Sequence, residues 1–368
     1  MTEFQNKYFD LLKSQYPSCS PLFSRENLID NLISSHVLRL PKDIYDRVTL
    51  AVKSIYNYSR TEKHLQHIIS SASPSELEIL NHKPVNTSVL MAYDFHYDLN
   101  SQLLSLIEIN TNASAFLLAD LLYKVEPQNG APWGNSLSHL QESFAKEFSS
   151  KKQSRQVAIV DANVPQQKMY IEFLMYLDFF KKMNLSARIF EFDELPIDQF
   201  HLVYNRHTDF LLSQSESQKL RKAYLENKII LSPNPKEYLL LALKDRLIDF
   251  YSANASDVLI PTVHLKNSQL KENAWARRKS LFFKPRNSFG AKAAYRGSSI
   301  SRKTFDQNID ENFIAQEYRP PGEIDGYKFD LRFYVYESQI QLAVARMYKG
   351  QVTNFSHPGG GLARVQFI

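Results

Sequence analysis

The stretch Leu281 to Gly297, LFFKPRNSFGAKAAYRG, decides the fold of this chain. An apolar run that predicts a strand carries Lys284, and a loop of glycine and small residues with a second lysine follows it. Backbone N–H groups of such a loop and a lysine ammonium can both face phosphate oxygens. Taken alone, the pattern is a weak signal for a nucleotide triphosphate grip, because Lys-Pro before a glycine loop also describes an ordinary hairpin. The case for a nucleotide therefore rests on the segments before and after it.

The composition is typical of a soluble globular protein. With 368 residues, the chain is long enough for two or three subdomains and a large core. Its 44 basic and 39 acidic residues give a net charge of +5, which suits a small anionic ligand such as ATP. The basic residues are scattered and form no stripe, so nucleic acid is not expected as a partner.

Cysteine usage and hydropathy narrow the class of protein further. The single cysteine, Cys19, excludes an intramolecular disulfide and a cysteine-based zinc site. The N-terminal segment lacks the apolar core of a signal peptide. No apolar run reaches the ~20 residues of a membrane span, so we expect a cytoplasmic protein with no membrane partner.

Residues 88–114 predict a hairpin of two apolar strands around a turn-rich centre. The first strand carries Asp94 and the second carries Glu108 and Asn110, which alternation puts on one face. Strand pairing can bring Asp94 to the same face, and two carboxylates with an amide oxygen suit Mg²⁺ and its phosphates. A half-buried hairpin with a solvated acidic face is the alternative. Because carboxylates in apolar strands are costly without a cation, the metal site is favoured.

Strands and helices alternate from Gln156 onward, which predicts a parallel, Rossmann-like sheet. No G-x-G-x-x-G follows the first strand, so the dinucleotide fingerprint is absent. Ligands of such sheets bind beyond the carboxyl ends of the strands. The candidate substrate residues at these ends are Asp161, Asn163, Asn205 and Arg206. Arg206 can clamp a substrate carboxylate, while helix caps and loop polar groups are an equally open interpretation.

The two ends of the chain differ in what they predict. Residues 1–88 predict helices and loops without a motif. A helix predicted after Pro233 carries Lys244 and Arg246, which reach a nucleotide only if this helix folds back on the later lobe. The last segment predicts two long antiparallel strands with a turn near Glu337, followed by a glycine-rich loop.

The order of motifs from Lys244 to Gly361 resembles the ATP-grasp ligases. That family has a DK element before a "gIPxP" strand, a lysine strand with a small-residue loop, a Q-E-(Y/F) connector, a D-(I/L)-R strand and an N-x₃-GG loop. The similar segments here are Asp245-Arg246 before Ile260-Pro261, Lys284 with 288–293, Gln316-Glu317-Tyr318, Asp330-Leu331-Arg332 and 354–361. One departure is Arg246 at the place of the first lysine, since arginine offers a cation of different geometry.

The resemblance implies a role for each matching residue. Lys284 with Lys244 or Arg246 is expected to hold the α- and β-phosphates of ATP. Other expected nucleotide contacts are Ser288, Gly290, Ala291, Lys292, Gln316, Glu317, Tyr318 and Asp330. The implied catalytic residues are Arg332, Arg346 and Asn354, and Gly360 is expected to contact substrate.

The magnesium strands of the family usually follow the glycine loop, where this chain ends. Asp94, Glu108 and Asn110 have the matching pattern near the front instead. The simplest account is a circular permutation, as in relatives of glutathionylspermidine synthetase.

The expected fold is therefore α/β (α+β): a circularly permuted ATP-grasp fold with a Rossmann-like preATP-grasp domain and an N-terminal helical region. The expected domains are 1–150, with the helical region and the metal hairpin, 151–240, the Rossmann-like domain, and 241–368, the nucleotide lobe. The resemblance implies an ATP- and Mg²⁺-dependent ligase that joins a carboxylate to an amine or thiol through an acyl-phosphate. Its substrate would be an amino acid, a peptide or another small carboxylate. A small-molecule kinase and a non-catalytic nucleotide-binding protein are the alternatives.

Overall fold

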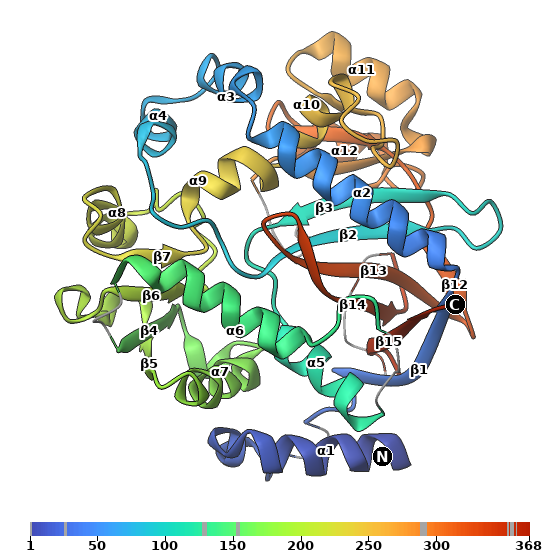
Figure 1. The fold of residues 1–368 in the computed structure, drawn as a ribbon. Helices are drawn as coiled ribbons and strands as arrows, with labels where there is room; N and C mark the ends of the chain where they lie inside the picture. Colours follow the sequence, from blue (N-terminus) through green and yellow to red (C-terminus); the bar gives the residue numbers. More distant parts are fainter. Residues whose placement is uncertain are drawn as a thin grey trace.

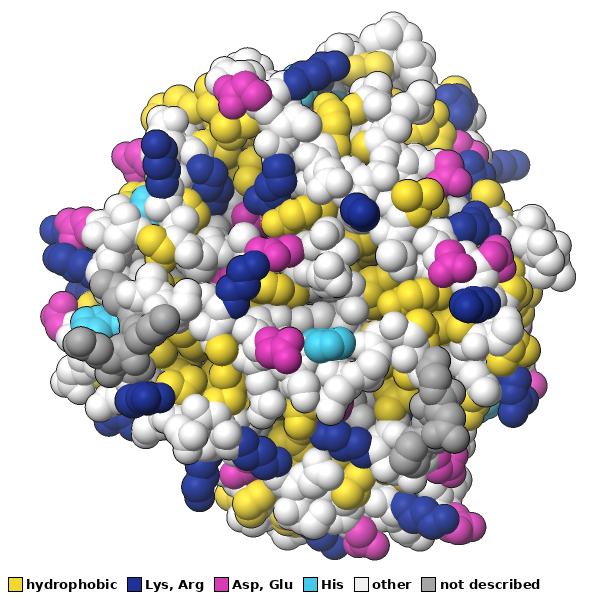
Figure 2. All heavy atoms as spheres, viewed as in Figure 1, with side chains coloured by type: hydrophobic (Ala, Val, Ile, Leu, Met, Phe, Trp, Pro, Cys, Tyr) yellow, Lys and Arg dark blue, Asp and Glu magenta, His cyan; other side chains and the backbone are white. Residues whose placement is uncertain are grey.

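The computed structural model describes residues 2–25, 28–126, 131–151, 155–287, 293–351, 353, 357 and 359–368. Its described residues form a mixed α/β structure in which helices surround three sheets (Figure 1). The α/β class predicted from the sequence is confirmed. None of the described helices is both long and apolar enough to span a bilayer. On the face shown in Figure 2, basic and acidic side chains are interspersed.

The large sheet joins the two ends of the chain. Its strand order is β1-β15-β14-β13-β2-β3, with β12 paired to β13. The bounds are β1 Ile33–Leu40, β2 Met91–Tyr97, β3 Leu104–Asn110, β12 Gly322–Ile324, β13 Tyr327–Tyr336, β14 Gln339–Tyr348 and β15 Gly361–Phe367. The two predicted hairpins, β2–β3 and β13–β14, are confirmed, and β2 pairs with β13. The hairpin at the front of the chain therefore lies in the same sheet as the C-terminal strands.

Strand β1 corrects the expectation that residues 1–88 hold only helices and loops. Ile33, Leu38 and Leu40 are buried, and β1 pairs in parallel with β15. This partner lies at the opposite end of the chain, so no local hairpin signal marks the strand. Strand β15 in turn continues directly from the glycine-rich segment, which was predicted only as a loop.

A small antiparallel sheet carries the stretch that opened the sequence analysis. Its order is β10-β9-β11-β8, and Lys284 of β9 lies opposite Ile314 of β11. The bounds are β8 Thr262–His264, β9 Leu281–Pro285, β10 Tyr295–Arg296 and β11 Phe313–Glu317. Phe283, Phe305 and Phe313 belong to the separate hydrophobic cluster under this sheet.

The third sheet is parallel, as predicted from the alternation of strands and helices. Its order is β5-β4-β6-β7. The bounds are β4 Gln156–Asp161, β5 Ser186–Glu191, β6 Leu202–Asn205 and β7 Ile230–Ser232. Helices α7 Tyr170–Lys182 and α8 Gln218–Leu225 connect these strands.

The remaining helices pack around the sheets, and α2 lies across the large sheet against β14 and β15 (Figure 1). The α-helices are α1 Glu3–Gln15, α2 Lys42–Ser59, α3 Glu62–Ile69, α4 Pro74–Asn81, α5 Phe116–Val125, α6 Ser136–Glu147, α9 Pro235–Glu237, α10 Arg246–Ser252, α11 Ser268–Ala276 and α12 Arg302–Asn308. Short 3₁₀ segments are η1 Pro17–Leu22, η2 Phe148–Lys151, η3 Val164–Gln166, η4 Phe192–Glu194, η5 Ile197–Gln199, η6 Ser215–Ser217 and η8 Arg278–Ser280.

The helix predicted after Pro233 is broken. A π-helical segment, η7 Tyr238–Ala242, is followed by Leu243 in an extended conformation with ψ 126°, and α10 begins three residues later. No glycine or proline marks this break in residues 236–251. Lys244 consequently lies on a turn between two helical segments rather than on a helix face.

Gly361 fixes the start of β15 and offers a test of this anchoring. Its φ is +110°, and a Cβ atom would lie 2.6 Å from the Leu32 carbonyl carbon and 2.7 Å from the Ile33 nitrogen. We expect Gly361→Ala to lower the free energy of unfolding by roughly 3 kcal/mol, because both the backbone and a β1 neighbour must shift. Gly326→Ala is the matched control: its φ is +74° with no atom within 4 Å. There only ~1 kcal/mol is expected in urea unfolding, and equal losses in the two variants would contradict the anchoring.

Candidate functional site

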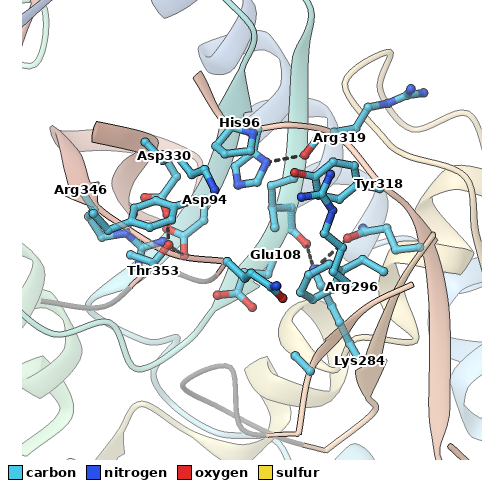
Figure 3. A pocket seen from close by; sticks show the side chains of 18 of the residues that line it. Asp94, His96, Glu108, Lys284, Arg296, Tyr318, Arg319, Asp330, Arg346 and Thr353 are labelled. Carbon is cyan, nitrogen blue, oxygen red and sulfur yellow. Dashed lines mark hydrogen bonds and ion pairs between the residues drawn. The ribbon is translucent and has the colours of Figure 1, made fainter. Parts of the chain in front are cut away.

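A pocket lies between the large and the small sheets (Figure 3). Basic side chains from both sheets and from the turn after η7 line it: Lys244, Lys284, Arg296, Arg319, Lys328 and Arg346. The acidic side chains that line it are Asp94, Glu108, Glu317 and Asp330. Because cations outnumber anions among these six and four side chains, the pocket suits an anionic ligand.

Lys284 joins the two sheets at the centre of the pocket. Its ammonium donates to the Ile107 carbonyl oxygen at 3.1 Å and to Gln316 Oε1 at 2.8 Å. The side chain is buried, and this burial lowers the pKa of Lys284 to about 8. Since Ile107 precedes Glu108 on β3, the lysine strand and the acidic hairpin meet at this point, although 177 residues separate the bonded pair.

Two arginines bind Asp94. The sequence predicted both as catalytic residues and did not predict that they pair with this carboxylate. Arg332 binds it in a bidentate manner, with Nε 2.8 Å from Oδ1 and Nη2 2.7 Å from Oδ2. Arg346 Nη2 lies 3.0 Å from Oδ2. Burial alone would raise the pKa of Asp94, but the two guanidinium charges outweigh it and hold that pKa at about 2. Asp94 is therefore a fully buried, neutralised carboxylate.

The expected metal set stays a prediction, and the ion pairs of Asp94 limit the oxygens that this residue can offer to a cation. Asp94, Glu108 and Asn110 do lie together, with Asp94 opposite Glu108 in the ladder. However, Arg332, Arg346 and Asn110 already occupy the oxygens of Asp94. Among the described residues, no group of three or more His, Cys, Asp or Glu side chains could hold a metal ion.

Glu108 lines the pocket, and Asn110, which is outside the lining, lies beside it as a second oxygen ligand. Asn110 Nδ2 donates to Asp94 Oδ2 at 3.0 Å and to Glu108 Oε1 at 3.4 Å, which orients the amide and leaves its Oδ1 as the acceptor. One carboxylate and one amide oxygen fit the usual protein share of a Mg²⁺ site, because that ion takes its other ligands from phosphates and water.

Of the two expected catalytic arginines, only Arg346 lines the pocket. Its Nε lies 2.6 Å from Asp330 Oδ1, and Asp330 also accepts a hydrogen bond from the Thr353 hydroxyl. Arg332 lies behind it, with 8% of its surface exposed, and is absent from the lining. Two carboxylates thus fix the guanidinium of Arg346 at the pocket wall.

The break after η7 decides between the two candidate phosphate cations. Lys244 lines the pocket, and burial lowers its pKa while the nearby Glu108 charge opposes this shift. Arg246 does not line the pocket; it is 5% exposed and lies 3.1 Å from Asp249. Lys244 is therefore the one of these two expected cations that lies at the pocket wall.

The expected connector also reaches the pocket. Gln316, Glu317 and Tyr318 all line it, and Gln316 is 2% exposed. The Arg296 guanidinium lies 4.4 Å from the centre of the Tyr318 ring, a cation–π contact between β10 and the residue that follows β11. Glu317 pairs with Arg319 at 2.9 Å.

The expected substrate residues lie outside this pocket, at the end of the parallel sheet. Arg206 Nη1 donates to Asn112 Oδ1 and lies 3.4 Å from the Ala113 carbonyl oxygen, so it packs two residues beyond Asn110. Asp161 Oδ1 accepts from the Ala162 N–H, and Asn205 Oδ1 accepts from the His207 N–H.

The remaining residues that the sequence predicted for the site are Asn163, Gly360 and five that the structure does not describe. Asn163 is exposed with a left-handed φ of 51°. Gly360 is buried, and a Cβ there would lie 2.9 Å from the Met347 carbonyl oxygen. Ser288, Gly290, Ala291, Lys292 and Asn354 lie outside the described residues.

Sequence reasoning missed several lining residues, among them His96, Arg296 and Thr353. The alternation from Asp94 to His96 on one strand was a usable signal, because it places both on one face. Arg296 closes the stretch that opened the analysis, so it too could have been proposed. Thr353 carried no pattern, since its partner Asp330 lies on a strand 23 residues away.

No protein-family model and no curated protein matches the sequence. Similar solved structures exist. One is a glutathione synthetase-like effector from Globodera pallida in its apo form, with a TM-score of 0.54 at 9% identity, covering 100% of this chain and 98% of that one. Another is a candidate gamma-glutamylcysteine synthetase from Methylobacillus flagellatus KT, with a TM-score of 0.47 at 10% identity, covering 86% of this chain and 87% of that one. The first likeness shows a mixed α/β fold of the glutathione synthetase-like kind over the whole chain.

Proposed function

We propose that this protein is an ATP-dependent ligase of the circularly permuted ATP-grasp type, which joins a carboxylate to an amine or thiol. The observation that carries the proposal is the meeting of Lys284 with the acidic hairpin in one pocket. A hairpin from the front of the chain and a lysine strand from its back then enclose a single magnesium-nucleotide. The fold similarity to a protein named as glutathione synthetase-like supports the same class.

Lys244 and Lys284 hold the α- and β-phosphates, and the connector 316–318 holds the base. Burial lowers the pKa of Lys284 to about 8, and a bound phosphate would oppose this shift and hold the ammonium in its charged form. Glu108 and Asn110 would hold Mg²⁺, which supplies charge neutralisation on the phosphates. The protein's own contribution is positioning and fixed positive charge.

The reaction proceeds in two transfers. A carboxylate oxygen of the first substrate attacks the γ-phosphorus, and the bond to the β-γ bridging oxygen breaks, releasing ADP. The amine nitrogen (or thiol sulfur) then attacks the acyl carbon, and inorganic phosphate leaves as the nucleophile loses its proton. Arg346, fixed by Asp94 and Asp330, neutralises the charge of the transferred group in both steps.

The hairpin gives the site a direction. The connector lies beside His96 at one end of β2, through a bond to the Arg319 carbonyl. Glu108 and Asn110 stand further along, and Arg206 packs just past the end of β3. We place the carboxylate substrate toward Arg206, which lies outside the pocket lining on the side away from the base.

The direct test is an ADP-release screen with Mg²⁺ and ATP over amino acids, peptides and polyamines as carboxylate and amine donors. Product analysis separates the outcomes: ADP with a new amide or thioester supports the ligase, and a stable phosphorylated product supports a kinase. ATP binding without ADP release in any mixture would overturn the ligase. It would support a non-catalytic nucleotide-binding protein, which the neutralised Asp94 favours because it leaves one hairpin carboxylate for the metal.

Lys244 and Arg246 give a matched pair for the phosphate site. We expect Lys244→Met to weaken ATP binding by about tenfold, since a desolvated charge–charge hydrogen bond contributes ~1.5 kcal/mol. Arg246→Met should leave ATP affinity unchanged but lower the free energy of unfolding by about 2 kcal/mol, because Asp249 keeps only the exposed His67 as its partner. Calorimetric titration with ATP and urea unfolding of both variants check this, and weaker ATP binding by Arg246→Met alone would reverse the assignment.

A further inference from the structure

His96 is a pocket residue that the proposed reaction does not use. It follows Asp94 by two residues on β2, and both line the pocket (Figure 3). Its Nδ1 lies 2.7 Å from the Arg319 carbonyl oxygen. A carbonyl oxygen only accepts, so Nδ1 carries the proton of this bond. The neutral ring therefore presents Nε2 to a ligand as a hydrogen-bond acceptor.

The location of His96 indicates which part of a ligand it meets. On one side, Arg319 directly follows the connector, and its carbonyl holds the imidazole. On the other side, Asp94 lies two residues along the strand, about 7 Å away, directly opposite Glu108. His96 thus lies between the connector, where the base is proposed to bind, and Glu108, which is proposed to hold Mg²⁺ at the phosphates.

In a nucleoside triphosphate, the sugar links the base to the phosphates. A side chain placed between the two binding regions therefore meets the ribose, whose hydroxyl groups are donors. The carboxylate of Asp330, whose charge acts on His96, already accepts from Arg346 and Thr353. Nε2 of His96 is consequently the acceptor suited to a sugar hydroxyl.

We propose that Nε2 of His96 accepts a hydrogen bond from a ribose hydroxyl of the bound nucleotide, and that this bond makes the pocket prefer ribonucleotides to deoxyribonucleotides. The inference rests on the proposed nucleotide site and adds a specificity-determining residue to it. It uses the strand alternation and the fixed imidazole of this chain.

The test compares the dissociation constants of ATP, 2′-deoxy-ATP, 3′-deoxy-ATP and ITP, each with Mg²⁺ and without a second substrate, by calorimetric titration. Wild-type protein is expected to bind ATP about two- to tenfold more tightly than one of the two deoxynucleotides, as one net hydrogen bond provides. In His96→Phe, which keeps a ring of similar size, this ratio is expected to fall to about one. His96→Gln, whose amide oxygen can accept, is expected to retain part of the ratio.

His201→Phe is the matched control, because His201 is exposed and lies outside the pocket lining. Its ratio should equal that of wild type, and thermal unfolding checks that all variants are folded. An unchanged ratio in folded His96→Phe, or no ribose preference in wild type, overturns the inference and leaves the ligase proposal standing. A loss of ATP-over-ITP preference alone would assign the bond to the base and also overturn it. Absence of ATP binding in wild type would overturn the nucleotide site itself.

Discussion

Replacing Glu108 with glutamine is expected to lower the rate of ADP release at saturating ATP by at least about 100-fold. Arginines already neutralise Asp94, which leaves Glu108 as the hairpin carboxylate that can take a cation beside Lys284. Glutamine keeps the shape and can still accept from Asn110, but it lacks the charge with which Glu108 would hold Mg²⁺. The loss should therefore fall on the chemical step more than on the fold.

Three measurements separate a loss of Mg²⁺ binding in Glu108→Gln from a loss of folding. The Mg²⁺ concentration for half-maximal rate should rise in Glu108→Gln, because one of two protein ligands has lost its charge. The midpoint of thermal unfolding should stay close to that of wild type. Glu323→Gln is the control, since Glu323 is an exposed carboxylate on β12 outside the pocket lining, and its rate should be unchanged. A Glu108→Gln variant with wild-type turnover would refute the metal assignment.

Local patterns predicted most of the strands, because each has its own alternation or apolar run. The hairpins β2–β3 and β13–β14 and the parallel sheet have their partners nearby in sequence or in a regular strand–helix repeat. Strand β1 has neither, since it pairs with β15 from the other end of the chain. The turn that brings Lys244 to the pocket was equally hidden, because a π-helical segment without glycine or proline precedes it.

In the candidate site too, contacts within one strand or hairpin were predictable, and contacts between distant segments were not. Asp94 needs positive charge beside it, since an unpaired buried carboxylate is very costly. A pair of guanidinium groups supplies positive charge to Asp94, and Arg332 stands 238 residues away from it in the chain. The sequence could show that Arg332 and Arg346 share a hairpin, but only the pairing of β13 with β2 sets Arg332 opposite Asp94. Spacing within one strand therefore predicts which residues share a face. Which residues of the neighbouring strand they contact depends on the pairing of the strands.

The ion pairs of Asp94 predict that removing Asp94 destabilises the fold more than removing Arg332 does. Asp94→Leu is expected to lower the free energy of unfolding by roughly 3–5 kcal/mol, because it leaves the buried Arg332 without its bidentate partner. Arg332→Leu should cost less, since Asp94 keeps Arg346 at 3.0 Å and Asn110 at 3.0 Å. The order of the two losses thus follows from which charge is left with a partner.

The double variant Asp94→Leu/Arg332→Leu completes the cycle. Its loss is expected to be smaller than the sum of the two single losses by at least about 1 kcal/mol, because removing both partners leaves no buried charge of this pair uncompensated. Urea unfolding of the four proteins measures every term, and Arg302→Leu serves as a control for an exposed ion pair, where the change should stay below ~1 kcal/mol. Additive losses would mean that Asp94 and Arg332 do not stabilise each other.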